Sequence, residues 1–258
     1  MKDKRTRPER PDPGADGIIE GRNAVAEALR AGTPIDKVFV LKGEVDLPLR
    51  QLANQARQQG AVLAEVDRHK LDAMSRTHAH QGIVAVAAVR EYASVEDLLQ
   101  AARDRGEPPL LVVCDELSDP HNLGAVIRTA DAAGAHGVII PKRRSAGLTA
   151  VVAKASAGAM EYMKIARVSN LTAAIKTLKE NGVWIYGTAA DGAAPLYRTD
   201  LTGPTAIVIG SEGEGMGRLV SESCDFMVSI PMKGHINSLN ASNACAILLY
   251  EAVRQRIK

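Results

Sequence analysis

The segment that decides the fold is residues 206–217, with the sequence AIVIGSEGEGMG. Its first half is an apolar run that is typical of a strand buried on both faces of a parallel sheet. Its second half carries glycines at 210, 213, 215 and 217, and glycine lets the backbone approach a ligand closely because it has no Cβ. Ligands of open parallel sheets bind beyond the carboxyl ends of strands. The segment therefore predicts an α/β domain with a ligand site at this loop.

Two common nucleotide-binding motifs do not fit the loop. A dinucleotide-binding fingerprint follows the first strand of its domain and has an acidic residue about 20 residues later. Here the loop comes late in its domain, and Ile230 and Pro231 occupy the region where that acid should lie. No G-K-[S/T] follows the glycines, which excludes a P-loop. Glu212 and Glu214 would repel a pyrophosphate, so the loop favours a ligand that is neutral or cationic near it.

A second polar loop, residues 119–130, has the sequence DPHNLGAVIRTA and follows a predicted strand at 110–114. It opens a helix that Asn122 is suited to cap. Arg128 lies beside the apolar stripe of that helix, where it is either a surface residue that snorkels to water or a ligand for an anion.

A third loop, residues 230–244, has the sequence IPMKGHINSLNASNA and leads into an apolar helix at 244–253. A helix start needs one capping side chain, which Asn237 or Ser238 could supply. The other hydroxyl and amide side chains of this loop have no such explanation, and they indicate a binding or catalytic site.

Outward from these loops, strands alternate with helices, which predicts a mostly parallel sheet covered on both faces. The first part of the chain predicts a smaller α/β sandwich, and a helix capped by Ser94 and Asp97 follows it. We expect a basic disordered tail at 1–16, a small domain at 17–90, a linker at 91–109 and a larger domain at 110–258. The predicted strands of the larger domain are 110–114, 137–140, 163–168, 183–187, 206–210 and 226–230, with helices such as 123–133 and 171–181 between them.

Composition narrows the class of protein. The 258 residues have a net charge of +2 and only 3% aromatic residues, which argues against binding that depends on stacking many bases. The three cysteines form no C-x-x-C pair and the six histidines form no ligand set, so we expect no metal. No stretch matches a signal peptide or a membrane span, and we expect a soluble cytoplasmic protein. Basic residues cluster in the tail, at 142–144 and at 254–258, each as solvated surface or as an RNA contact.

The three loops, in this order, resemble the three motifs of the SpoU/TrmH branch of SPOUT RNA methyltransferases. The matching patterns are N-L-G-x-x-x-R-T-A at 122–130, I-G-S-E-G-x-G at 209–215 and I-P-M-x-G-x-x-x-S-L-N-A-S at 230–242. Residues 19–29, IEGRNAVAEAL, resemble the substrate-binding domain that precedes the catalytic domain in this family. The resemblance covers the chain except its tail, and it is closest to the bacterial enzymes that methylate a guanosine of 23S rRNA.

The resemblance implies an α/β fold with a small N-terminal domain similar to ribosomal protein L30e/L7Ae, which binds substrate RNA. It implies a C-terminal SPOUT domain with a parallel sheet and a trefoil knot, an exception to the rule against threaded chains. It also implies a homodimer with the active site near the interface. The activity would be transfer of a methyl group from S-adenosylmethionine to the ribose 2′-hydroxyl of a guanosine in 23S rRNA.

By motif match, the cofactor-binding positions are Gly210, Ile230 and Leu239, and Met232 would share an apolar adenine slot with them. The same match implies a catalytic site formed by Asn122, Arg128, Glu212, Ser238 and Asn240. The family proposal makes Arg128 the general base. A guanidinium keeps its proton in proteins, so Glu212 could take the proton while Arg128 anchors a phosphate or stabilises the alkoxide, and both roles stay open.

Three alternative functions remain at this point. The first is the same chemistry on tRNA, although such enzymes often lack a long N-terminal domain, so residues 17–90 favour rRNA. The second is a non-catalytic rRNA-binding or assembly factor, against which the intact catalytic set counts. A Rossmann-type oxidoreductase is the third, and the order of its glycines does not match.

Overall fold

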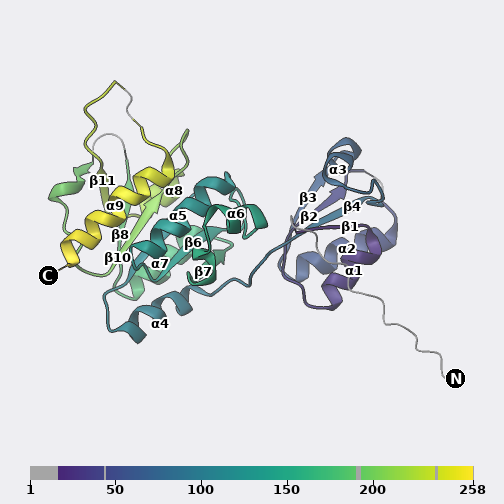
Figure 1. The fold of residues 1–258 in the computed structure, drawn as a ribbon, viewed down its shortest axis with the longest axis horizontal. Helices are drawn as coiled ribbons and strands as arrows, with labels where there is room; N and C mark the ends of the chain where they lie inside the picture. The colour runs from purple at the N-terminus through teal and green to yellow at the C-terminus, as the bar shows by residue number, and fades with distance from the viewer. Residues whose placement is uncertain (1–16, 44, 190–192, 236–237, 258) are drawn as a thin grey trace. The chain divides into compact units, whose positions relative to one another are not determined.

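The computed structural model describes residues 17–43, 45–189, 193–235 and 238–257. The predicted disordered tail at 1–16 and the proposed cap Asn237 lie outside these residues. The chain divides into two compact units, Met1–Val89 and Arg90–Lys258, each with its own sheet and core (Figure 1).

The first unit is a four-stranded sheet with helices α1 and α2 packed on one face, which agrees with the predicted α/β class of this part of the chain. The strand order is β1-β4-β2-β3; β2 and β3 are parallel, and β4 is antiparallel to both of its neighbours. The short elements β1 and α3 are not predicted, because three and seven residues are too few to show a periodic pattern. The elements are β1 (Ile18–Glu20), α1 (Arg22–Arg30), β2 (Ile35–Leu41), α2 (Leu47–Gln58), β3 (Val62–Val66), α3 (Arg68–Met74) and β4 (Ile83–Ala87).

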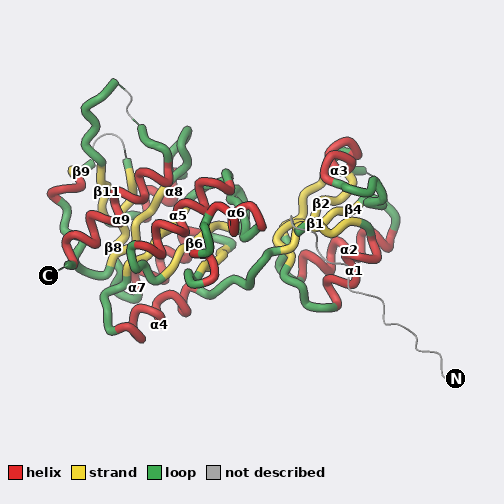
Figure 2. The backbone as a smooth tube through the Cα atoms, viewed as in Figure 1, coloured by secondary structure: helices red, strands yellow, loops and turns green. Residues whose placement is uncertain are grey.

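The second unit is a seven-stranded sheet in which every pairing is parallel, with strand order β7-β6-β5-β10-β8-β11-β9. Helices α5, α6 and α9 share one core with one face of the sheet, and α4, α7 and α8 share a second core with the other face (Figure 2). Its strands are β5 (Leu110–Cys114), β6 (Gly137–Pro141), β7 (Ile165–Val168), β8 (Trp184–Thr188), β9 (Ala194–Pro195), β10 (Thr205–Ile209) and β11 (Phe226–Ser229). Its helices are α4 (Val95–Arg105), α5 (Pro120–Ala132), α6 (Ala150–Ala155), α7 (Leu171–Glu180), α8 (Arg218–Ser223) and α9 (Ala241–Arg256), with 3-10 turns at Ala159–Glu161 and Leu196–Arg198.

The segment expected as a linker, residues 91–109, carries helix α4. Ser94 and Asp97 form the predicted capping box at its start, and Gly106 ends the helix in a left-handed conformation. Leu98 and Leu99 are buried in the second unit, so this stretch is part of that unit rather than a free connection. A periodic helix is read equally well as a connector or as a core helix, and only its burial separates the two.

Helix α9 is fixed at its last turn by Arg256. The guanidinium donates hydrogen bonds to the carbonyl oxygens of Leu201, Gly203, Pro108 and Pro109. Arg254 pairs with Glu251, at 2.8 Å between Nε and Oε2. The side chains of Arg254 and Arg256 therefore both have partners within the second unit.

The trefoil knot that the resemblance implies stays a prediction. In the described part of the chain, no helix is long and apolar enough to cross a membrane.

Gly124 is required by the close approach of helices α5 and α6. A Cβ built on Gly124 would lie 2.4 Å from the Cβ of Ala155 and 3.0 Å from the Ser156 nitrogen. We predict that Gly124→Val lowers the free energy of unfolding by about 1–3 kcal/mol, because overpacking a close contact forces backbone shifts. Urea denaturation measures this change. Gly203→Ala is the matched control, since a Cβ there meets nothing within 4 Å, and an equal loss in both variants would contradict the packing role.

Candidate active site

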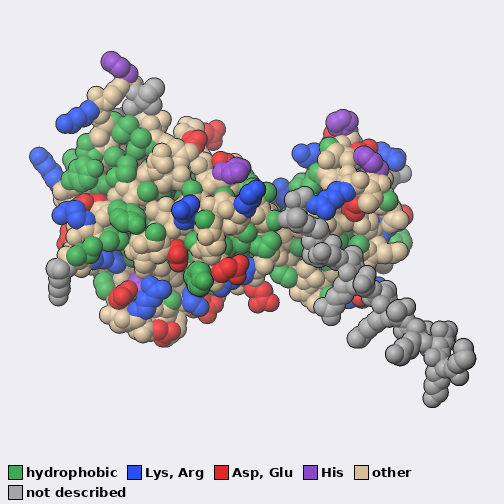
Figure 3. Space-filling view, in the orientation of Figure 1, with side chains coloured by type: hydrophobic (Ala, Val, Ile, Leu, Met, Phe, Trp, Pro, Cys, Tyr) green, Lys and Arg blue, Asp and Glu red, His purple; other side chains and the backbone are tan. Residues whose placement is uncertain are grey.

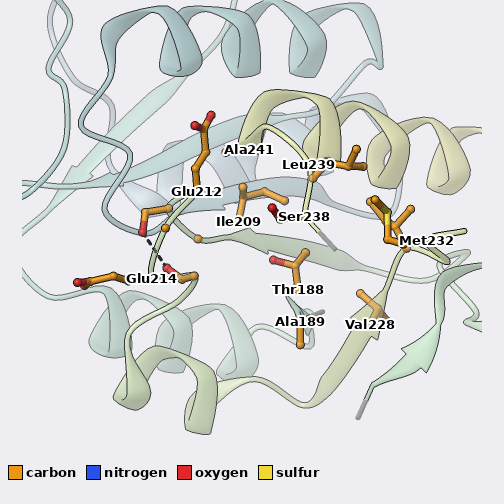
Figure 4. A pocket seen from close by; sticks show the side chains of 16 residues that line it. Thr188, Ala189, Ile209, Glu212, Glu214, Val228, Met232, Ser238, Leu239 and Ala241 are labelled. Atoms are coloured by element: carbon orange, nitrogen blue, oxygen red, sulfur yellow. Dashed lines mark hydrogen bonds between the residues drawn. The ribbon is translucent and has the colours of Figure 1, made fainter. Parts of the chain in front are cut away.

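A cavity of about 390 Å³ lies at the carboxyl ends of β8, β10 and β11, which is in the range of small-molecule sites. All four predicted cofactor positions line it: Gly210, Ile230, Met232 and Leu239. Figure 4 shows Glu212 and Glu214 at one end of the cavity and Met232 at the other. The rest of the wall is formed by Thr188, Ala189, Ile209, Ser211, Gly213, Gly215, Val228, Ser238, Ala241 and Ala244.

The glycine loop closes on itself. The Ser211 N–H donates to the Gly215 carbonyl at 2.9 Å, and the Gly215 N–H donates back to the Ser211 carbonyl at 3.1 Å. A Cβ at Gly210 would lie 2.2 Å from the Gly215 carbonyl carbon, which no side chain tolerates. The turn itself therefore requires glycine at position 210, independently of whether a ligand approaches the backbone there.

Asp115 anchors the far end of this loop, and it is not among the residues that the sequence predicts. It directly follows β5, and its Oδ2 accepts a hydrogen bond from the Gly217 N–H at 2.8 Å. Burial raises the pKa of the Asp115 carboxyl, against the lowering effect of the Gly217 bond. An acidic residue directly after an apolar strand, at the edge of the sheet where ligands bind, is the sequence signal that could have identified it.

Three of the five predicted catalytic residues form one hydrogen-bonded network. The Asn122 amide donates to Glu212 Oε1 at 2.8 Å, and the Asn240 amide donates to Asn122 Oδ1 at 2.9 Å. The Asn240 amide also donates to Glu212 Oε1. Each residue belongs to a different one of the three sequence motifs, so the network ties the motifs together at the edge of the cavity that Glu212 also lines.

The helix caps differ from those expected. Asp119 caps α5 by accepting from the His121 N–H at 3.0 Å, because the helix begins at Pro120, and Asn122 is left inside the first turn. Asn240, rather than Ser238, caps α9 and accepts from the Ser242 N–H at 3.0 Å. Asn240 therefore uses its oxygen for the cap and its amide nitrogen for the network.

Ser238 and Arg128 stand apart from the network. Ser238 lines the cavity. Arg128 is exposed on α5, and within the described residues it makes no hydrogen bond or ion pair. Arg128 is six positions after Asn122 on α5, which turns their side chains about 120° apart around the helix axis. No group of three metal-binding side chains occurs in the described part of the chain.

Comparisons with known protein families match both units. Residues 109–250 match the SpoU rRNA Methylase family, and residues 18–93 match the domain described as RNA 2′-O ribose methyltransferase substrate binding. YacO of Bacillus subtilis (strain 168), named as a TrmH family tRNA/rRNA methyltransferase, is 48% identical over 238 residues, 92% of this chain and 95% of the relative.

Two solved structures show the same similarity. The SpoU methyltransferase AviRb from Streptomyces viridochromogenes, in complex with AdoMet, is 29% identical with a TM-score of 0.59, covering 95% of this chain and 91% of that chain. The A. aeolicus TrmH/SpoU tRNA modifying enzyme is 30% identical with a TM-score of 0.53, but the match covers only 63% of this chain and 84% of that chain.

The chain therefore belongs to the SpoU/TrmH family of RNA 2′-O-ribose methyltransferases, which depend on S-adenosylmethionine. The resemblance, the α/β fold class and the cofactor predicted from the sequence are confirmed.

The residues of the cavity fit this cofactor. Ile209, Val228, Ile230 and Leu239 give an apolar wall suited to an adenine ring, and the acidic side chains lie at one end. S-adenosylmethionine supplies an electrophilic methyl group on a positively charged sulfonium. Carboxylates near this loop would attract such a charge, whereas they would repel a pyrophosphate.

Asn240→Asp separates the two roles of this residue. The new carboxylate still caps α9 but places a negative charge against Glu212 in place of the donated hydrogen bond. We predict a change in thermal stability of about 1 kcal/mol or less from the cap, while methyl transfer falls by on the order of tenfold or more. Asn240→Ala, which loses both roles, is the comparison in the same assays. Unchanged turnover in Asn240→Asp would remove the network from catalysis.

Proposed function

We propose that this chain methylates the ribose 2′-hydroxyl of a guanosine in 23S rRNA, with Asn122, Arg128, Glu212, Ser238 and Asn240 as its catalytic set. The observation that supports this most directly is the network of Asn122, Glu212 and Asn240 beside the cofactor cavity. A ribose hydroxyl is a poor nucleophile until its proton is removed, and a carboxylate fixed by two amides is suited to receive that proton.

Within the proposed site, each residue has a distinct task. Glu212 presents its second oxygen, Oε2, to the hydroxyl while Oε1 accepts from the two amides. Arg128 either takes part in the proton transfer or holds the phosphate and the developing alkoxide by its charge. Gly210, Ile230, Met232 and Leu239 hold the cofactor, and Ser238 lies in the same cavity.

The proposal includes a homodimer. Arg128 meets none of the network residues within one chain, although it matches the same family motif as Asn122. An active site near a dimer interface would bring groups together that one chain leaves apart. We also propose that the enzyme acts on RNA in the cytoplasm, in keeping with its similarity to bacterial tRNA/rRNA methyltransferases such as YacO.

The choice of rRNA over tRNA rests on the first unit. The substrate-binding domain matches residues 18–93, whereas the tRNA modifying enzyme from A. aeolicus matches only 63% of this chain. YacO is named for both RNA classes, so tRNA is the second candidate substrate. A non-catalytic assembly factor would have no need to keep the network intact.

Labelled methyl transfer to unmodified 23S rRNA and to tRNA transcripts tests the substrate class. We predict transfer to 23S rRNA, to a guanosine 2′-hydroxyl when the site is mapped, and little transfer to tRNA.

A chain truncated to begin at Arg90 should bind the cofactor yet lose this preference, because α4 stays with the catalytic unit and the RNA-selecting unit is removed. Preferential labelling of tRNA would contradict the rRNA assignment, and full activity of the truncated chain would contradict the division of tasks.

Substitutions of Arg128 test its role. We predict that Arg128→Ala leaves cofactor binding intact by calorimetry and lowers turnover by on the order of a hundredfold or more. Arg128→Lys keeps the charge but loses the planar fork. Recovery of activity with a shifted pH profile in Arg128→Lys would support a base, and continued inactivity would support an anchor. Turnover near that of the wild type in Arg128→Ala would exclude Arg128 from the mechanism.

A further inference from the structure

A group of three cations lies at the carboxyl ends of β6 and β7, outside the network described above. Lys142 directly follows β6, and its N–H donates to the Val168 carbonyl at 2.7 Å. Arg167 pairs in register with Ile140, two residues before Lys142, so the side chains of Arg167 and Lys142 lie on the same face of the sheet. Arg143 follows and is exposed.

Tyr92 holds this group in place. The Arg167 guanidinium stacks over the Tyr92 ring, 4.1 Å from its centroid. The Tyr92 hydroxyl accepts from the Leu148 N–H at 3.0 Å and from Arg167 Nη1 at 3.4 Å. One aromatic side chain thus fixes both the arginine on β7 and the loop that carries Lys142 and Arg143.

Lys142 lies in an electrostatically unfavourable environment for a cation. Burial, and then the charges of Arg167 and Arg143, lower the pKa of the Lys142 ammonium. In the described part of the chain, the side chains of Lys142 and Arg143 make no hydrogen bond or ion pair. Arg167 also lines a cavity of about 380 Å³ whose other polar residues are Ser94, Glu96, Ser169, Asn170 and Thr177.

The other basic cluster of this unit does not share these properties. Arg254 is paired with Glu251, and Arg256 donates to backbone carbonyls. Figure 3 shows lysine and arginine side chains interspersed with acidic ones over the face in view, without one large surface of a single sign. The group around Tyr92 differs from the cluster at 254–256, because the side chains of Lys142 and Arg143 have no hydrogen bond or ion pair among the described residues.

The loop that carries Lys142 and Arg143 also contacts the residues that follow β5. Arg144 pairs with Glu116 at 2.7 Å, and both residues have a left-handed backbone, at φ of 58° and 57°. The hydrogen bond and the charge of Glu116, and more weakly the charges of Glu214 and Asp115, raise the pKa of the Arg144 guanidinium. The Ala146 N–H donates to the Leu117 carbonyl at 2.8 Å, so the loop with the cations lies beside the loop that follows β5.

We propose that Lys142, Arg143 and Arg167, arranged around Tyr92, bind backbone phosphates of the substrate RNA on the catalytic unit itself, next to the site of methyl transfer. This inference rests on the proposed function and adds to it a second RNA-binding surface. Phosphates would supply a counter-charge to Lys142 and Arg143, whose side chains have no partner among the described residues, and a phosphate also accepts the fork of an arginine.

The test compares two double variants of the full chain. Lys142→Gln with Arg143→Gln removes two charges of the proposed surface, and Arg103→Gln with Arg198→Gln removes two exposed charges elsewhere in the same unit. Binding to unmodified 23S rRNA transcripts is measured over a range of salt concentrations, with S-adenosylmethionine binding by calorimetry and methyl transfer in parallel. Two lost phosphate contacts should reduce the slope of log K against log salt by about 1.4–1.8 and weaken binding by on the order of tenfold.

The expected result is that only the Lys142/Arg143 variant shows these losses, with cofactor affinity within about twofold of wild type. If its salt slope and RNA affinity equal those of the Arg103/Arg198 variant, the inference is overturned while the proposed function stands. A change in oligomeric state by sedimentation, at an unchanged salt slope, would also overturn it. If the wild type transfers no methyl group to either RNA class, the proposed function fails and this inference fails with it.

Discussion

Strand β10 lies between β5 and β8 in the sheet and pairs in parallel with both of them. This central position of β10 determines which loops lie side by side at the carboxyl edge of the sheet. The loops that follow β5 and β10 become neighbours at the centre of the sheet, and Asp115 joins them by accepting from Gly217. The carboxyl ends of parallel strands lie at the same edge of a sheet. Polar residues that directly follow different strands therefore meet at that edge although they are distant in sequence.

At that edge the chain uses capping groups for two purposes. The oxygen of Asn240 satisfies the first N–H groups of α9, and its amide nitrogen points into the network with Asn122 and Glu212. A cap is among the best-defined side-chain positions on a helix, because the hydrogen bond orients it and the helix that follows is rigid. Using it to hold a carboxylate gives the site a fixed geometry before any ligand binds.

The regular elements could be predicted from the sequence, because apolar runs and helical stripes are local. All six predicted strands of the larger sheet are present, and β9, with two residues, shows no pattern to detect. The motif match predicts Gly210, Ile230, Met232 and Leu239 as cofactor positions, and these four residues line one cavity. Helix starts were misplaced by a few residues at Asn122 and Ser238, since several residues in each loop are equally good caps.

Contacts between distant residues could not be predicted in this way. The anchoring of Gly217 by Asp115 and the stacking of Arg167 on Tyr92 join residues 102 and 75 positions apart. A local pattern can point to Asp115 as a polar residue after a strand, but it does not tell which distant residue Asp115 or Arg167 contacts. The sequence predicts a linker at 91–109, whereas α4 in this stretch packs into the second unit. Its periodicity predicts a helix, but only the tertiary structure shows Leu98 in a core.

Helix α9 has its two ends attached to different parts of the second unit. Asn240 ties its start to the loops around the cavity, and Arg256 ties its last turn to the carbonyls of residues 108, 109, 201 and 203. Its 16 residues make a rod about 24 Å long. Because a helix is rigid along its axis, the contacts of Arg256 at its last turn help to determine the position of Asn240 at its start. A change at Arg256 would therefore be expected to displace the Asn240 amide at the other end of the helix, about 24 Å away.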